Sequence, residues 1–234
     1  MAARLLGVML ACVMAPLSLA GPVLQVDLAG EYRALRASTP DVVPGGFEQE
    51  LAERLAASLQ RPLALGNSAA ADLVIGAQAQ GAAFYQSQMA ALSATMGGVE
   101  RWEQLRDQPF CVAQGSPYGE QVVRRFAGQR REYPSAAHAL IGLKLGECRA
   151  VVEDSRLLAD IAPLPEWQRY NRLLPALDEG VTLSVKAGDP TLQAQVEERL
   201  EAWRHDGSLE QLIQQWVDEV AFQAYVLADT LDCH

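Results

Sequence analysis

The stretch that decides the fold runs from Phe110 to Asp154. It begins FCVAQGSPYGEQVVRRF (110–126) and continues, four residues on, as REYPSAAHALIGLKLGECRAVVED (131–154). Three short apolar runs alternate with two helical segments, and such alternation indicates βαβ units around a parallel sheet. Gln114-Gly115-Ser116 and Glu153-Asp154 each end a predicted strand. Open α/β sheets bind ligands at that edge, so both spots are candidate site residues.

The first of these spots is also a helix entry. Ser116 is a favoured N-cap and Pro117 takes the preferred first helical position. A helix N-terminus carries a partial positive charge and can hold a carboxylate, while Asp154 could hold an ammonium group. Together the two spots suit a zwitterion. An ordinary capped helix and an ordinary turn acid stay open as alternatives.

The flanking sequence predicts further α/β structure. Strands are expected at 23–28, 62–65, 72–75 and 181–185, and a loop at 167–175. Helices are expected at 47–59, at 192–203 and from Ser208 onward. At the last of these, Ser208 and Gln211 would form a capping box. Residues 73–99 contain no charged side chain. We interpret that segment as a buried connecting strand or the floor of a cleft.

The N-terminus predicts export. Residues 1–20 combine Arg4, an apolar stretch and the small-residue site Ser18-Leu19-Ala20, which is typical of a secretory signal peptide. A lipoprotein with a modified Cys12 is the weaker alternative. Of 19 basic and 29 acidic residues the signal removes only Arg4, which leaves 18 against 29 and a net charge of −11. The expected location is the periplasm, with no membrane span and no nucleic-acid partner.

Three cysteines remain after cleavage, in an oxidising compartment. Cys111 opens the first strand of the central unit and Cys148 the third, and these strands should be neighbours about 4.8 Å apart. That spacing suits a disulfide, so we predict Cys111–Cys148. Cys233 is left over, next to His234.

Catalytic and metal sites are not indicated. His138 and His205 have no spacing typical of a triad or a metal pair, and phosphate-binding glycine loops are absent. Glu153 and Asp154, adjacent on a strand, should point to opposite faces and so form no catalytic pair. We expect no enzyme activity, no cofactor and no metal.

With these residues placed, the chain resembles the periplasmic solute-binding proteins of the polar amino-acid (family 3) type, the receptors of ABC importers. Five segments, in order and at similar spacing over residues 23–217, carry the resemblance: Gly46-Phe47-Glu48…Leu51-Ala52…Leu55-Ala56, Leu105-Arg106-Asp107…Val112-Ala113-Gln114-Gly115-Ser116, GECRAVVED (146–154), Val185-Lys186-Ala187-Gly188-Asp189-Pro190 and Asp206-Gly207-Ser208…Trp216.

The resemblance implies a type II two-lobed α/β fold, each lobe a mostly parallel sheet flanked by helices and joined by two hinge strands. Lobe 1 would comprise 21–92 and 186–234, and lobe 2 would comprise 93–185. Ser116 would meet the ligand carboxylate, Asp154 the ammonium, and Tyr32 the side chain. Gln78, Gln114 and Gly115 complete the implied ligand set.

The sequence departs from the family where an amino acid would be held. The lobe 1 motif T-x-x-R supplies an arginine for the carboxylate, but the equivalent region here reads GAQAQGAAFYQSQ (76–88). The family's "PPF" after Tyr32 is replaced by Arg33-Ala34-Leu35, and the segment between the second and third strands is shortened by roughly a helix.

The sequence supports two hypotheses about function. The first is a periplasmic receptor that captures a small polar or amino-acid-like solute for an ABC permease or a sensor domain. The alternative is a degenerate accessory protein that binds a protein partner instead, with residues 218–234 as a docking element. A periplasmic dehydratase on this scaffold would need a general acid in the cleft, and the only candidates are Glu153 and Asp154.

Overall fold

The strands of the protein join into one mixed sheet. The structure, a computed structural model, describes residues 21–30, 32–36, 46–66, 70–77 and 79–231. Within these residues eight strands form a sheet in the order β2-β1-β3-β8-β4-β7-β5-β6. Their bounds are β1 Leu24–Leu28, β2 Leu63–Leu65, β3 Leu73–Gly76, β4 Ala82–Ser93, β5 Pro109–Ala113, β6 Gln129–Tyr133, β7 Ala150–Asp154 and β8 Arg172–Ala187.

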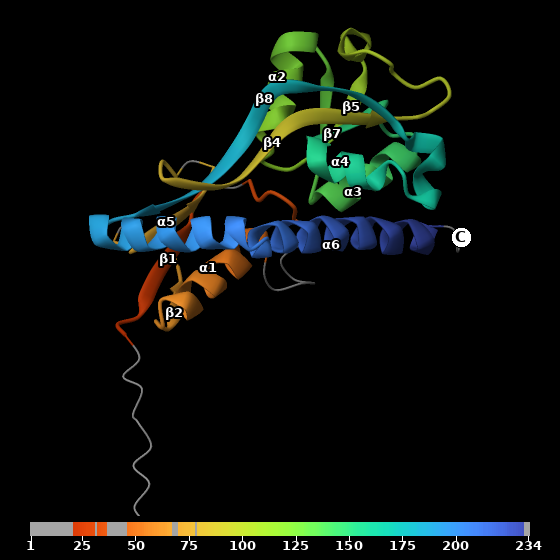
Figure 1. Ribbon diagram of the computed structural model, residues 1–234. Coiled ribbons are helices and arrows are strands. Elements are labelled where there is room, and N and C mark those ends of the chain that lie inside the picture. Colours follow the sequence, from red (N-terminus) through yellow and green to blue (C-terminus); the bar gives the residue numbers. More distant parts are fainter. Residues whose placement is uncertain (1–20, 31, 37–45, 67–69, 78, 232–234) are drawn as a thin grey trace, which may run out of the picture.

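The sheet has two parallel ends and an antiparallel middle. At one end β1 pairs in parallel with β2 and β3, and at the other β5 pairs in parallel with β6 and β7. Between them β4 and β8 run antiparallel to each other, β8 pairs with β3, and β4 pairs with β7. Figure 1 shows the two long strands passing from one end of the molecule to the other. This arrangement confirms the predicted α/β class with two connecting strands.

The uncharged segment, residues 73–99, contains β3 and the long connecting strand β4, which agrees with the first of its two interpretations. β4 pairs with β8 from Ala82 opposite Val185 to Ser93 opposite Arg172. β8, however, begins nine residues earlier than the predicted strand at Val181, and the loop expected at 167–175 is wrong. Register shifts in β4 around Met89 interrupt the pairing, and such irregularities hide the alternation by which a strand is found in sequence.

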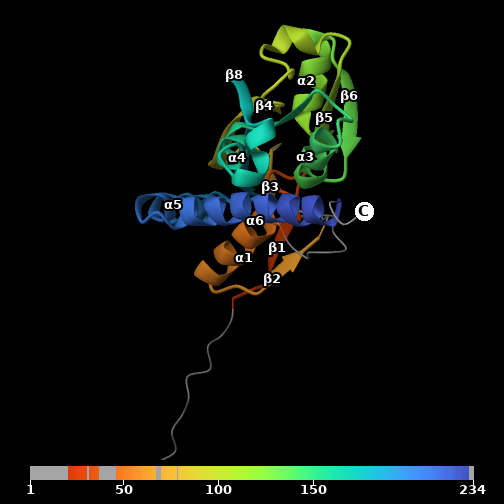
Figure 2. The same cartoon turned by 90° about the vertical axis from the view of Figure 1, so that its right-hand side faces the viewer.

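Helices cover both ends of the sheet (Figure 2). Their bounds are α1 Phe47–Ser58, α2 Pro117–Phe126, α3 Ala136–Lys144, α4 Ser155–Ile161, α5 Pro190–His205 and α6 Ser208–Leu231, with the 3₁₀ turns η1 Trp102–Leu105 and η2 Pro165–Tyr170. Ser116 and Ser135 cap α2 and α3 as predicted. The capping box at Ser208 is wrong, because its hydroxyl has no hydrogen-bond partner among the described residues.

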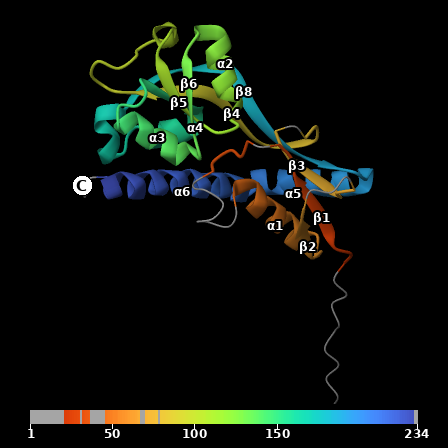
Figure 3. The same ribbon diagram turned by 180° about the vertical axis from the view of Figure 1, so that it is seen from behind.

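Helix α6 connects the two ends of the molecule. It packs against α1 and α5 on one side and against α3 and α4 on the other, and Figure 3 shows α5 and α6 following one another along this boundary. The Trp216 indole N–H donates to Glu50 Oε2 of α1 at 2.8 Å, and Gln214 Nε2 donates to Asp160 Oδ2 of α4, also at 2.8 Å. A C-terminal helix fixed to both ends should limit their relative motion. The predicted division into two lobes stays a prediction.

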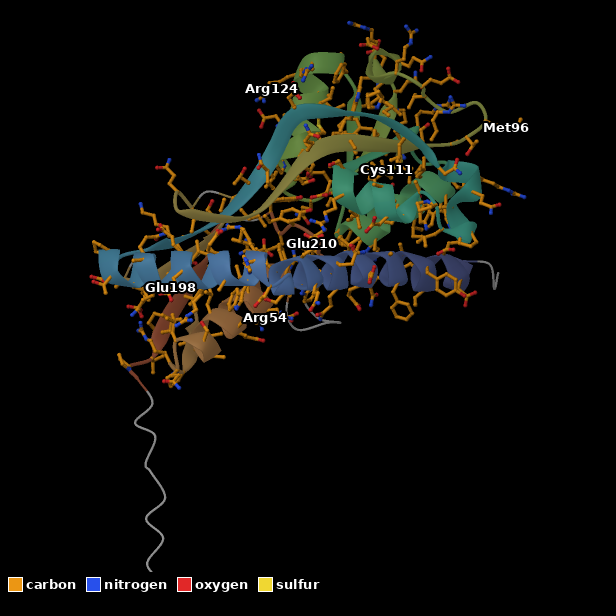
Figure 4. The ribbon with its side chains drawn as sticks, viewed as in Figure 1. Arg54, Met96, Cys111, Arg124, Glu198 and Glu210 are labelled. Atoms are coloured by element: carbon orange, nitrogen blue, oxygen red, sulfur yellow. A yellow bond between two sulfur atoms is a disulfide. The ribbon has the colours of Figure 1, made fainter. Side chains whose placement is uncertain are left out.

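The predicted disulfide is present. Cys111 of β5 and Cys148, just before β7, are bonded, with their Cα atoms 5.7 Å apart. Both residues are buried, and Figure 4 labels Cys111 at the end of the molecule that holds the central unit. The neighbouring positions of β5 and β7 explain why the sequence argument succeeded.

Among the described helices, none combines the length and the apolar character needed to cross a membrane. The expected signal peptide and Cys233 lie outside the described residues.

Candidate functional site

Three tyrosines and two acids meet at the middle of the molecule. Tyr32 follows β1, Tyr85 lies on β4, Tyr118 on α2, and Glu153 and Asp154 end β7. Each side chain is buried, with 8% exposure for Tyr32 and 3% or less for the other four. We call these five residues the tyrosine–carboxyl cluster.

Asp154 uses both of its carboxyl oxygens within the protein. Oδ1 caps α4 by accepting from the Arg156 N–H at 2.9 Å and from the Leu157 N–H at 3.2 Å. Oδ2 accepts from the Tyr85 hydroxyl at 2.5 Å. The group that should receive a ligand ammonium is therefore held by a tyrosine of β4. Its predicted role as a ligand residue remains untested.

Glu153 is the neighbouring acid, and its environment disfavours ionisation. Burial, and secondly the charge of Asp154, raise the pKa of Glu153 to about 8. Tyr32 donates to Oε1 at 3.3 Å. The main-chain N–H groups of Asp154 and Ala113 lower the pKa slightly, but neither reaches Oε2, which has no hydrogen-bond partner among the described residues.

Glu153 and Asp154, which the sequence predicts on opposite faces of the strand, belong to one cluster of contacts, and the charge of Asp154 raises the pKa of Glu153. Glu153 contacts Tyr32, Asp154 contacts Tyr85, and the Tyr32 and Tyr118 rings meet edge-on with centroids 6.2 Å apart. Burial, and then both acids, raise the pKa of Tyr118 well above its ordinary value. Asp154 is both the last residue of β7 and the N-cap of α4.

A second feature is a cavity of about 400 Å³ lined by Gly30, Arg33, Arg36, Gln114 and Gly115. The first three residues follow β1, and the last two form the turn from β5 into α2. The cavity thus joins one parallel end of the sheet to the other, at the carboxyl ends of two strands. We call it the arginine cavity.

The arginine side chains in this cavity are held differently. The Arg33 guanidinium donates to the carbonyl oxygens of Leu28 at 2.6 Å and of Ala29 and Tyr32, both at 3.1 Å. Arg36 makes no hydrogen bond or ion pair with the described residues, although its charge and that of Arg33 act on buried Glu48. Burial nonetheless raises the pKa of Glu48 to about 7. Main-chain oxygens therefore hold the Arg33 guanidinium in place, whereas none of the described residues holds that of Arg36.

The predicted ligand residues do not form a single site in the structure. Tyr32 and Asp154 belong to the tyrosine–carboxyl cluster, and Gln114 and Gly115 line the arginine cavity. Ser116 is 6% exposed, and its hydroxyl accepts from the Tyr118 N–H at 3.3 Å, as a helix cap. Gln78 lies outside the described residues.

Sequence reasoning missed the partners of these residues. The sequence around Tyr85 and Tyr118 gives no sign of what their hydroxyl groups contact. Arg33 is recognisable in the sequence only as a departure from the family pattern, and no motif marks Arg36. An arginine was expected at T-x-x-R, but the structure places two arginines in the segment after β1.

Substituting Asp154 should separate the structural role of this side chain from a ligand role. Asp154→Ala removes an N-cap and leaves the buried Tyr85 hydroxyl without an acceptor, so we expect a loss of about 3 kcal/mol. That corresponds to roughly 6 to 12 °C in Tm for a chain of this size. Asp154→Asn keeps a capping oxygen and should lose only about 1 kcal/mol. Thermal unfolding followed by circular dichroism checks both; equal stability of the two variants would contradict the assigned contacts.

The comparisons with known proteins bear on the fold. No protein-family model and no curated protein sequence matches the chain. Solved structures do match over most of its length. An ancestral arginine-binding protein bound to arginine is 17% identical, with a TM-score of 0.59, over 83% of this chain and 97% of that one. The chain has the fold of the amino-acid solute-binding proteins.

Two other solved structures support the same fold. The substrate-binding protein of an amino acid ABC transporter is 16% identical, with a TM-score of 0.57, over 83% of this chain and 98% of that one. An ancestral amino-acid-binding protein, described as a precursor of cyclohexadienyl dehydratase, is 18% identical, with a TM-score of 0.60, over 83% and 95%. The type II binding-protein fold predicted from the sequence is confirmed.

Proposed function

We propose that the protein is a periplasmic solute-binding protein that captures a small polar solute in the arginine cavity, for an ABC permease or a sensor domain. The observation that carries the proposal is the cavity itself. Its volume of about 400 Å³ lies within the range of small-molecule sites. Residues from both parallel ends of the sheet line it, so a bound solute would contact both.

The solute position differs from the one that the family resemblance implied. Asp154 already accepts three hydrogen bonds within the protein. Glu153 is 2% exposed, so its carboxyl is not open to a solute from outside. We therefore place the solute against Arg36, Gln114 and Gly115 rather than against the acids.

A screen of solutes against the mature protein, residues 21–234, tests this function. A ligand at about a hundred times its dissociation constant adds about 2.7 kcal/mol to the free energy of unfolding, a Tm shift of several degrees for a protein of this size. We expect at least one class of polar solute to give that shift. A folded sample that responds to none would contradict the proposal.

A second candidate is the accessory protein that binds a protein partner, and α6 favours it. This helix fixes both ends of the molecule and carries the exposed side chains Phe222, Tyr225 and Val226 at 58%, 48% and 39% exposure. Their i, i+3, i+4 spacing puts them on one stripe of the helix. If this function holds, Phe222→Ser/Tyr225→Ser should leave Tm unchanged and abolish binding to the partner.

The tyrosine–carboxyl cluster gives little support to an enzymatic function. The raised pKa of Glu153 suits a general acid. A general acid must also reach its substrate, and Glu153 is 2% exposed within a packed cluster. We therefore propose a binding function.

A further inference from the structure

The charges around the arginine cavity point to the class of solute. Its described lining residues are two arginines, one glutamine and two glycines, and none of these five is acidic. Among them, a cation or the ammonium end of a zwitterion has no anionic partner. An anion would find two cations.

Arg33 is prepared to face an anion. A guanidinium has five N–H donors, and three hydrogen bonds to main-chain oxygens hold this one in place. Two N–H groups, that on Nε and one on Nη2, remain without an acceptor among the described residues. A cation that is already ordered loses little side-chain entropy when a ligand binds.

Arg36 and Gly115 supply donors that the protein does not otherwise use. Arg36 is partly exposed and makes no hydrogen bond or ion pair with the described residues. The Gly115 N–H likewise has no acceptor among them, since the turn bonds run from Gln114 to Tyr133 and from Ser116 to Ala113. Gly115 has φ +73°, a conformation that favours glycine and leaves the backbone open to close approach.

Among the described residues, both arginines act on one buried acid, Glu48, in the first turn of α1. It is 1% exposed, and neither of its side-chain oxygens has a hydrogen-bond partner among the described residues. Neither arginine forms an ion pair with it. One buried acid does not offset two cations, so the described residues give the cavity a positive local charge, although the whole chain has a net charge of −10.

We infer that the arginine cavity binds a small dianion, such as a dicarboxylate or a phosphate compound, between Arg33, Arg36 and the Gly115 N–H. Oxyanions accept charge-assisted hydrogen bonds from guanidinium groups at the planar geometry these groups favour. This inference rests on the proposed function and names its substrate class.

The test compares anions of different charge. Mature protein is titrated calorimetrically with succinate, inorganic phosphate, the monoanion butyrate and the zwitterion L-glutamine. We expect succinate or phosphate to bind at least about tenfold more tightly than butyrate and L-glutamine, and to weaken as ionic strength rises. Succinate alone would identify a dicarboxylate site, and phosphate alone a phosphate site.

A variant locates the site. Arg36→Gln removes one cation that makes no hydrogen bond or ion pair with the described residues, and should weaken dianion binding at least about tenfold with little change in Tm. Arg199→Gln is the matched control, because Arg199 is exposed on α5 and makes no ion pair with the described residues. Its dianion affinity should equal that of the unmodified protein. Arg33 is not substituted, since it holds the loop that it belongs to.

The outcomes separate the two proposals. If neither dianion binds but another solute does, the dianion inference is wrong and the solute-binding function stands. If dianions bind equally well to Arg36→Gln, they bind elsewhere, and the inference is again wrong. If no solute of any class binds folded protein, both proposals fail and the accessory function takes their place.

Discussion

Replacing Glu153 by glutamine should leave stability nearly unchanged at pH 5 and raise it by about 4 kcal/mol at pH 8. The cause is the buried carboxyl, whose pKa rises from 4.5 to about 8 on folding. Between these values the folded state keeps a proton that the unfolded state releases. The free energy of unfolding then falls by about 1.4 kcal/mol per pH unit as pH rises, and levels off above pH 8.

Glutamine removes this dependence because it does not ionise, and its oxygen can still accept from Tyr32. The measurement is thermal or urea unfolding of both proteins at pH 5, 6, 7 and 8. Glu48 has a pKa raised to about 7 and adds a decline of the same sign, which remains in the variant. The difference between the two proteins isolates Glu153.

Glu198→Gln is the matched control for this series. Glu198 is exposed on α5 (Figure 4), so its neutralisation should change stability by less than about 0.5 kcal/mol at every pH. A Glu153→Gln variant whose gain is the same at pH 5 and pH 8 would show that Glu153 is ionised in the folded protein, and the description of the cluster would be wrong.

Removing the disulfide should lower the free energy of unfolding by an amount similar to the change predicted for Glu153→Gln at pH 8. The bond closes a loop with a sequence separation of 37 residues, and the loop-entropy relation gives about 4 kcal/mol for a loop of this length. Cys111→Ala/Cys148→Ala should therefore be less stable by about that amount, a Tm loss of roughly 8 to 16 °C. Unfolding is measured with Cys233→Ser in both proteins, to exclude pairing through that thiol.

A reducing agent supplies the control for this prediction. Dithiothreitol should lower the Tm of the parent towards that of the double alanine variant and leave the variant unchanged. A parent protein whose Tm does not respond to complete reduction would show that the bond contributes nothing to stability.

The fold could be predicted from sequence because it depends on local signals. The Ser116 and Ser135 caps and the alternation of apolar runs in 110–154 fix strands and helices within a few residues. The position of β5 beside β7 followed from the expected parallel order, and the disulfide from that position. The start of β8 was missed because register shifts interrupt its pairing with β4.

The site could be predicted only in part, because its contacts join distant segments. Asp154 was located as a strand-end acid, but its partner Tyr85 lies 69 residues away. Tyr32 and Glu153 are 121 residues apart. Arg33 stands where the family has "PPF", and Arg36 follows that segment, so a comparison of motifs shows the loss of the family motif there and not the gain of two positive charges.

The most direct test of the account is calorimetric titration of the mature protein with each proteinogenic L-amino acid. Because Tyr85 and the α4 N-terminus use both oxygens of Asp154, we predict no binding tighter than about 1 mM for amino acids with neutral side chains. The contrary result would be a neutral amino acid that binds with micromolar affinity and loses that affinity in Asp154→Asn. Asp154 would then hold the ligand ammonium, and the contacts described for it could not be those of the working protein.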